Sequence, residues 1–178
     1  MFDYNIWKRV ICTRQRLDLI MGLKTTYVMS DICIMDVNYH SLFLIQEDKW
    51  YMRDTYPKAE IIAGAIAAFQ HNNSRREYLL KKPLDTYTFP CLTIRSGRRF
   101  TFYKITVNQS LSDAVKYGIS PETTTSIVQV YSPTESMSSD IFNSSCRKKV
   151  MQCLKLFKDH VKDFDTDQSL LSLPSSSY

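Results

Sequence analysis

The stretch that decides the fold covers residues 28–49 and reads VMSDICIMDVNYHSLFLIQEDK. Its two apolar runs, Val28 to Met35 and Leu42 to Ile45, are typical of β-strands. The polar segment Asp36–Tyr39 between them favours a turn, so we expect the two strands to be antiparallel neighbours in a hairpin. Because the second run is apolar without interruption, we expect it to be buried on both faces, inside a sheet covered by helices.

The sequence after this hairpin predicts a helix, a second hairpin and two further helices. Apolar residues recur at helical spacing after Pro57, and we expect Asn72 and Asn73 to end that helix. The other expected elements are strands over Tyr87–Ile94 and Arg99–Val107, a helix over Ser110–Tyr117 closed by Gly118, a short strand over Ile127–Tyr131 and an amphipathic helix over Ile141–Phe164. This order predicts an α/β fold in which a mixed sheet is flanked by helices.

Length and composition predict one globular domain. The chain has 178 residues, of which 44% are hydrophobic and 23% charged, so it can bury a core. We expect a single α/β domain over residues 1–164 and a flexible Ser-rich tail over residues 165–178. The low glycine content, four residues, disfavours a Gly-rich phosphate-binding loop.

Cysteine spacing and the lengths of the apolar runs predict the compartment. The five cysteines form no CxxC pair, which disfavours both a zinc knuckle and a disulfide framework. No apolar run reaches the roughly 20 residues of a membrane-spanning helix, and charges interrupt the N-terminal region where a signal peptide needs an apolar core. The sequence therefore favours an intracellular protein, cytoplasmic or nuclear, with no membrane partner. His40, His71 and His160 lack the spaced partners of a zinc site, so we expect them to be structural or exposed.

Carboxylates and a lysine gather around the first hairpin. Alternate side chains of a strand share a face, so we expect Glu47 and Lys49 to point one way and Asp48 the other. Asp31, on the partner strand, is expected to lie within reach of Glu47 on the same face. Two carboxylates can hold Mg²⁺, which lowers the pKa of a bound water, and a lysine can orient that water. This chemistry is that of metal-dependent phosphodiester hydrolysis.

The same residues resemble the signature of the PD-(D/E)xK nucleases. Fifteen residues separate Ser30-Asp31 from Glu47-Asp48-Lys49. The segments LIQEDK at residues 44–49 and AEIIAGAIAAFQ at residues 59–70 are similar to a group of uncharacterised fungal proteins related to that superfamily. The resemblance covers about residues 12–107 and implies a restriction-endonuclease-like domain that acts on nucleic acid, with DNA expected rather than RNA.

The resemblance also implies roles for individual residues. It implies Mg²⁺, with Mn²⁺ as a substitute, as the cofactor. Asp31 and Glu47 are then the metal ligands, with a backbone-carbonyl contact from Asp48, and Lys49 is the catalytic lysine. A glutamine on the following helix assists the site in several branches, and Gln70 is the candidate here.

Basic residues between the expected helix and the second hairpin, and in the turn of that hairpin, are candidates for binding the nucleic-acid backbone. They are Arg75, Arg76, Lys81, Lys82, Arg98 and Arg99. Aromatic residues interleave with them, as in surfaces that bind single strands. A solvated charged face over core aromatics is the alternative interpretation of the same pattern, and the net charge of +5 is compatible with both.

The chain departs from the superfamily pattern in ways that keep a second hypothesis open. The proline before the aspartate is Ser30 here, and the region before Val28 contains no glutamate of the kind that the first helix of many members supplies. We expect from this a truncated or degenerate copy. The alternative function is therefore a catalytically inactive nuclease-like module that binds nucleic acid or another protein.

Overall fold

The structure is a computed structural model that describes residues 9–48, 57–95, 99–121, 127–131 and 141–169. Within these residues the core is a six-stranded sheet whose strands lie side by side in the order β1-β2-β3-β4-β5-β6. The strands are β1 (Val10–Met21), β2 (Lys24–Met35), β3 (Ser41–Asp48), β4 (Thr86–Arg95), β5 (Arg99–Asn108) and β6 (Ile127–Tyr131). All neighbours are antiparallel except β3 and β4, which are parallel. The α/β class and the mixed sheet predicted from the sequence are therefore confirmed.

The predicted first hairpin is confirmed as β2 and β3, which pair Cys33 with Leu44 and Ile34 with Phe43. The Asp36–Tyr39 turn is closed by its own aspartate, whose Oδ1 accepts hydrogen bonds from the backbone N–H of Asn38 and of His40, each at 2.8 Å. Leu42, Phe43 and Leu44 are almost fully buried, as a central strand requires.

Strand β1 is an element that the sequence interpretation missed. Its charged residues, such as Arg16 and Asp18, are exposed, while Leu17 and Leu19 alternate with them and are buried. Alternation with period two is the pattern of an edge strand that is covered on one face only. The interpretation weighted the charges, which argue against an apolar run, over the alternation.

Helix α1 (Pro57–Tyr78) packs on one face of the sheet and is longer than predicted. Asn72 and Asn73 do not end it. The Asn72 amide is buried and accepts a hydrogen bond from Ser41 N at 2.7 Å and donates one to Ser41 O at 2.8 Å. Asn73 does the same for Leu84 N and O, at 2.8 and 3.1 Å. These amides bind backbone of other segments, so they leave the helix free to continue.

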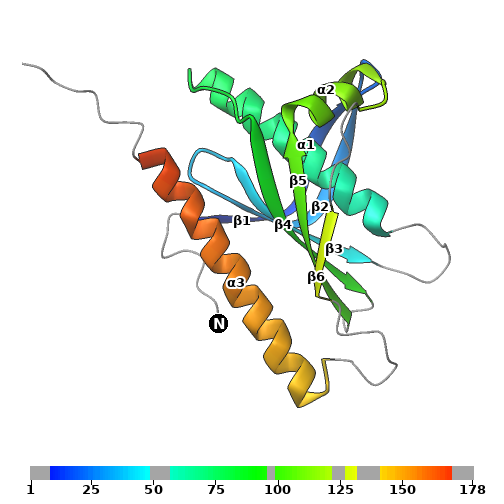
Figure 1. The fold of residues 1–178 in the computed structure, drawn as a ribbon, viewed down its shortest axis with the longest axis vertical. Coiled ribbons are helices and arrows are strands. Elements are labelled where there is room, and N and C mark those ends of the chain that lie inside the picture. Colours follow the sequence, from blue (N-terminus) through cyan, green and yellow to red (C-terminus); the bar gives the residue numbers. More distant parts are fainter. Residues whose placement is uncertain (1–8, 49–56, 96–98, 122–126, 132–140, 170–178) are drawn as a thin grey trace, which may run out of the picture.

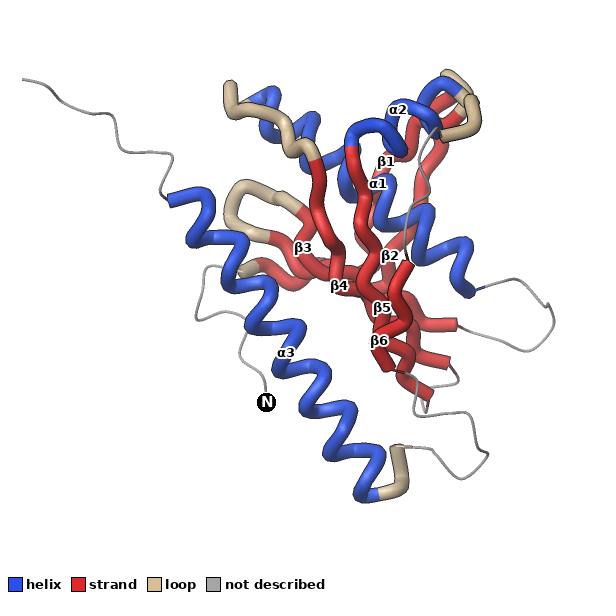
Figure 2. The backbone as a smooth tube through the Cα atoms, in the orientation of Figure 1, coloured by secondary structure: helices blue, strands red, loops and turns tan. Residues whose placement is uncertain are grey.

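Helix α2 (Gln109–Tyr117) is capped at its start by the Asn108 side chain, which accepts a hydrogen bond from Leu111 N. It ends at Gly118, whose left-handed φ of 69° strains residues that carry a Cβ atom and therefore favours glycine. Helix α3 (Ser144–Ser169) covers the opposite face of the sheet from α1, as Figures 1 and 2 show. Its predicted apolar stripe is confirmed, because Val150, Phe157 and Val161 are buried against Phe43 and Phe102. The helix extends past the residue 164 boundary expected for the domain.

Within the described residues, none of the helices is long and apolar enough to cross a membrane. The five cysteines are all free thiols, as their spacing predicts. Burial raises the pKa of the Cys33 thiol to about 12, so this sulfur stays a neutral part of the core.

Candidate metal and nucleic-acid site at the end of strand β3

The candidate site lies where β3 ends beside β4. Because these two strands are parallel, their carboxyl ends meet at the same edge of the sheet. The register pairs Glu47 with Ile94 and Asp48 with Arg95, and Arg95 in turn pairs with Arg99 on β5. The backbone therefore places an acidic strand end next to two arginines, a combination suited to a cation and a phosphate.

A hollow of about 330 Å³ lies near the same edge. Gln46 from β3 and Glu60 from the first turn of α1 line it, together with Tyr27, Val28, Met29 and Ala63. Glu60 is exposed and was not a candidate in the sequence analysis. The signal was available, since a helix that follows a strand after a short connection begins near the end of that strand, so its first-turn carboxylate faces the same edge.

Asp31 lies in the middle of β2, not near its start, because the strand begins at Lys24. The ladder to β1 pairs Thr13 with Ile32 and Gln15 with Ser30, and between these pairs Arg14 adopts a left-handed φ of 51°. The Ser30 hydroxyl donates to Ile32 O at 2.9 Å and to Ile45 O at 3.3 Å.

This irregularity changes which face the side chains of β2 take. Val28 and Cys33 both pack into the cluster under α1, although strict alternation would put residues five positions apart on opposite faces. The expectation that alternation alone brings Asp31 and Glu47 to one face assumed a regular strand. The side chains of Glu47 and Asp48, and the whole of Lys49, lie outside the described residues, so their convergence with Asp31 stays a prediction.

Gln70 is not placed to assist this site. Its Oε1 accepts a hydrogen bond from Ile20 N at 2.8 Å and its Nε2 donates one to Ile20 O at 3.2 Å, so the amide holds edge strand β1 against α1. At 1.5 Å per residue, Gln70 lies about 15 Å along the helix from Glu60. The carry-over of a catalytic glutamine to Gln70 is therefore wrong, and a structural role explains the residue.

The basic candidates separate into two groups. Arg76 is buried, with Nε donating to Lys82 O at 2.6 Å, and Arg75 donates to Asn38 O at 3.3 Å. Burial lowers the pKa of Arg76, with a smaller opposing effect from Asp36. Lys81 and Lys82 are exposed at the same end of α1.

The second basic group is the one near the candidate site. Arg99 begins β5 next to the end of β4, while Arg98 lies outside the described residues. The residues around Arg75 and Arg76 are about 22 Å along α1 from Glu60. Arg75 and Arg76 are thus largely structural, and Arg95 and Arg99 are the arginines that the fold brings to the end of β3.

The histidines have structural roles, as predicted. His40 is buried and its Nδ1 lies 2.8 Å from Asp36 Oδ2. His71 Nε2 contacts Tyr39 O at 3.0 Å, and His160 Nε2 contacts Thr88 O at 3.1 Å. Burial by itself would raise the pKa of Asp36, but hydrogen bonds from His40 and Asn38 outweigh it and hold the pKa below its ordinary value.

Among the side chains that the structure describes, no group of three or more His, Cys, Asp and Glu could hold a metal ion. Comparisons with known proteins found no match to the chain among family models, curated proteins or solved structures.

Proposed function

We propose that this protein is a divalent-metal-dependent phosphodiester hydrolase that acts on nucleic acid, with DNA as the expected substrate. Asp31 and Glu47 are its metal ligands, Asp48 adds its backbone carbonyl, and Lys49 is its catalytic lysine. The observation that carries the proposal is the parallel pairing of β3 with β4, which sets Glu47 and Asp48 beside Arg95 and the start of β5.

The connectivity of the sheet supports the same proposal. Three antiparallel strands are followed by helix α1 and by a strand parallel to the third, with strand order matching chain order. The PD-(D/E)xK resemblance implies a hairpin, a helix and a second hairpin in this order over about residues 12–107, and the described elements follow that order.

The donor set fits a hard cation. Carboxylate and carbonyl oxygens are the ligands that Mg²⁺ and Mn²⁺ take in proteins, and Glu60 adds a third carboxylate from the adjacent hollow. When bound, the ion supplies Lewis-acid polarisation of the phosphate and an acidified water. Lys49 would then orient the nucleophilic water, and Arg95 and Arg99 would hold the phosphate backbone of the substrate.

The test measures metal binding and cleavage separately. We expect calorimetric titration with Mg²⁺ or Mn²⁺ to give saturable heat that Glu47→Ala abolishes, and metal-dependent cleavage of plasmid or single-stranded DNA that Lys49→Ala abolishes while leaving metal binding intact. Asp159→Ala and Lys155→Ala, on exposed positions of α3, are the matched controls.

Failure of both measurements would overturn the proposal. The inactive module, the alternative hypothesis, predicts no heat with either metal ion and no cleavage of DNA or RNA. Metal binding without cleavage of any substrate would support a nuclease-derived domain that retains its ligands.

A further inference from the structure

Three sulfur-containing side chains gather on the face of the sheet that α1 covers. Cys12 on β1 is the Cα partner of Cys33 on β2, and Met35 follows Cys33 two positions later on the same face. The Sγ atom of Cys12 lies 3.9 Å from the Sδ atom of Met35. We call Cys12, Cys33 and Met35 the sulfur cluster.

The side chains of the sulfur cluster are close enough to share one metal ion. A zinc–sulfur bond is about 2.3 Å long, so two sulfur ligands of an ion of this size lie within about 4.6 Å of each other. The distance between the Cys12 and Met35 sulfur atoms is inside this limit. Directly opposed residues of antiparallel strands have Cβ atoms about 4.5 to 5.5 Å apart, so the Cys33 sulfur can reach the same ion by rotation of its side chain.

One buried hydroxyl beside the sulfur cluster has no use in the fold. Ser41 is the Cα partner of Met35 and is 0% exposed, and its Oγ has no hydrogen-bond partner of standard geometry among the described residues. Burial raises the pKa of the Cys33 thiol, and the neighbouring Ser41 hydroxyl acts on this sulfur in the opposite direction. A neutral thiol is a weak acceptor and a thiolate a strong one, so Ser41 is placed to donate to a Cys33 sulfur that carries negative charge.

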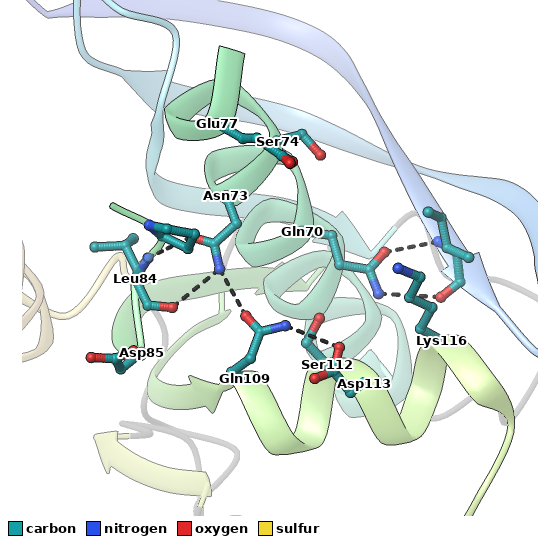
Figure 3. A pocket seen from close by; sticks show the side chains of 12 residues that line it. Gln70, Asn73, Ser74, Glu77, Leu84, Asp85, Gln109, Ser112, Asp113 and Lys116 are labelled. Atoms are coloured by element: carbon teal, nitrogen blue, oxygen red, sulfur yellow. Dashed lines mark hydrogen bonds between the residues drawn. The ribbon is translucent and has the colours of Figure 1, made fainter. Parts of the chain in front are cut away.

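The backbone around the sulfur cluster is held in place by two side-chain amides of α1. Figure 3 shows one of them, Gln70, making two hydrogen bonds to strand β1 at Ile20. Asn72 binds both backbone groups of Ser41 on β3 in the same way. Because β1 and β3 are both fixed to α1, the sulfur atoms between them are preorganised.

The donor set of the sulfur cluster selects a soft cation. A structural zinc site needs four ligands, and within the described residues no group of three or more His, Cys, Asp and Glu could hold a metal ion. Thiolate and thioether sulfur together favour Cu(I), for which two or three such ligands suffice. Cys33 and Met35 are buried, while Cys12 on edge strand β1 is half-buried, so an ion reaches the cluster from the side of Cys12.

We propose that the sulfur cluster binds one Cu(I) ion through the thiolates of Cys12 and Cys33 and the thioether of Met35, with Ser41 donating a hydrogen bond to the Cys33 sulfur. Binding forms three copper–sulfur bonds and breaks two S–H bonds, whose protons pass to water, and the ion is neither oxidised nor reduced. None of these side chains belongs to the metal site proposed at β3, so this proposal stands or falls independently of that function.

The test titrates the reduced full chain with Cu(I) in the absence of oxygen, in competition with a chromophoric Cu(I) chelator. Ag(I), which has the same charge and preference for sulfur, is the second probe. We expect one ion to bind per chain, with thiolate-to-copper charge-transfer absorption in the ultraviolet. In a chain labelled at the methionine methyl groups, the NMR signal that Met35→Leu removes should shift on binding.

Variants identify the ligands. Met35→Leu keeps the core volume, and we expect it and Ser41→Ala each to weaken Cu(I) binding about tenfold or more. Cys12→Ser and Cys33→Ala each remove a thiolate and should weaken binding further. Cys153→Ser changes a half-buried thiol on α3 and is the matched control, which should bind as the unaltered chain does. Urea denaturation of each variant shows that it folds.

Three results would each overturn the proposal. The first is the absence of binding at one ion per chain with both Cu(I) and Ag(I). The second is unchanged affinity in Cys12→Ser or in Met35→Leu, either of which tests the cluster even if Cys33→Ala does not fold. The third is loss of binding in Cys153→Ser, which would place the ion on α3.

Discussion

The two halves of helix α1 serve different purposes. Glu60, in the first turn, is exposed and borders the hollow beside β3. The last turns, from Gln70 to Arg76, are committed to the fold, because their polar side chains bind the backbone of Ile20, Ser41 and Asn38. Polarity in a helix therefore marks function only where the polar group is not already satisfied by another segment.

The largest effect on stability is expected at the Asp36–Tyr39 turn, which is hydrogen-bonded to the second half of α1. Asp36→Ala removes a buried carboxylate that holds the His40 ring and two backbone N–H groups, and we expect a loss of about 3 to 5 kcal/mol in the free energy of unfolding. Urea denaturation measures it. A loss below about 1 kcal/mol would mean that the turn is not part of the committed region.

The same carboxylate has a defined pH signature. Because its folded pKa lies below the ordinary 3.8, Asp36 contributes stability that is complete above the unfolded pKa and is lost as pH falls through the folded pKa. Asp36→Asn should therefore flatten the stability curve in this acid range. An unchanged slope below pH 4 would contradict the assignment.

Next in size is Asn72, which is 0% exposed and binds both backbone groups of Ser41. Asn72→Ala leaves a buried N–H and a buried carbonyl without partners, so we expect a loss of about 2 to 4 kcal/mol. Ser74→Ala, two residues further along α1 and exposed, is the control and should change stability by less than about 0.5 kcal/mol.

A smaller effect concerns His71. Burial lowers its pKa from the ordinary 6.5, and the cation of Arg75 adds to this, partly opposed by the hydrogen bond at Tyr39. The unfolded chain then takes up a proton first as pH falls through 6.5, so stability decreases from there toward the folded pKa. His71→Gln should remove this decrease, which equilibrium unfolding at several pH values between 5 and 7.5 would detect.

The smallest effect on stability is expected at the other end of α1. Glu60→Gln should change the free energy of unfolding by less than about 0.5 kcal/mol, because the side chain is exposed, yet weaken Mg²⁺ binding several-fold. Calorimetry on the variant checks both. If Glu60→Gln lowered the free energy of unfolding and left the Mg²⁺ affinity unchanged, the first half of α1 would be structural like the second half.

Local patterns predicted the elements whose signals are local. The Asp36–Tyr39 turn, the start of α1 at Pro57 and the end of α2 at Gly118 follow from residues that act on their own neighbours. Asn72 was misread as a stop signal, because its partner Ser41 is distant in sequence and no local pattern shows it. The same reason explains Gln70, whose partner on β1 belongs to a strand that charges had concealed.

The candidate site was predictable in composition but not in geometry. The ExK triplet and Asp31 stand out in the sequence, whereas the parallel pairing that sets Asp48 beside Arg95 depends on a crossover through α1. The break in alternation at Arg14 and Ser30 is tertiary too, since nothing in either residue type requires it.

The parallel pairing of β3 with β4, which we call the β3–β4 seam, also has a consequence for the order in which the strand pairs form during folding. The β1–β2, β2–β3 and β4–β5 pairs are joined by short segments, and β5 and β6 are separated by 18 residues that include α2. The β3–β4 seam closes over the longest connection, residues 49–85 with α1, and such non-local pairing limits folding rates. Trimming Leu44, which faces Cys91 across the seam, should therefore slow folding, whereas trimming Leu19 on the β1–β2 hairpin should mainly speed unfolding, as stopped-flow kinetics would show.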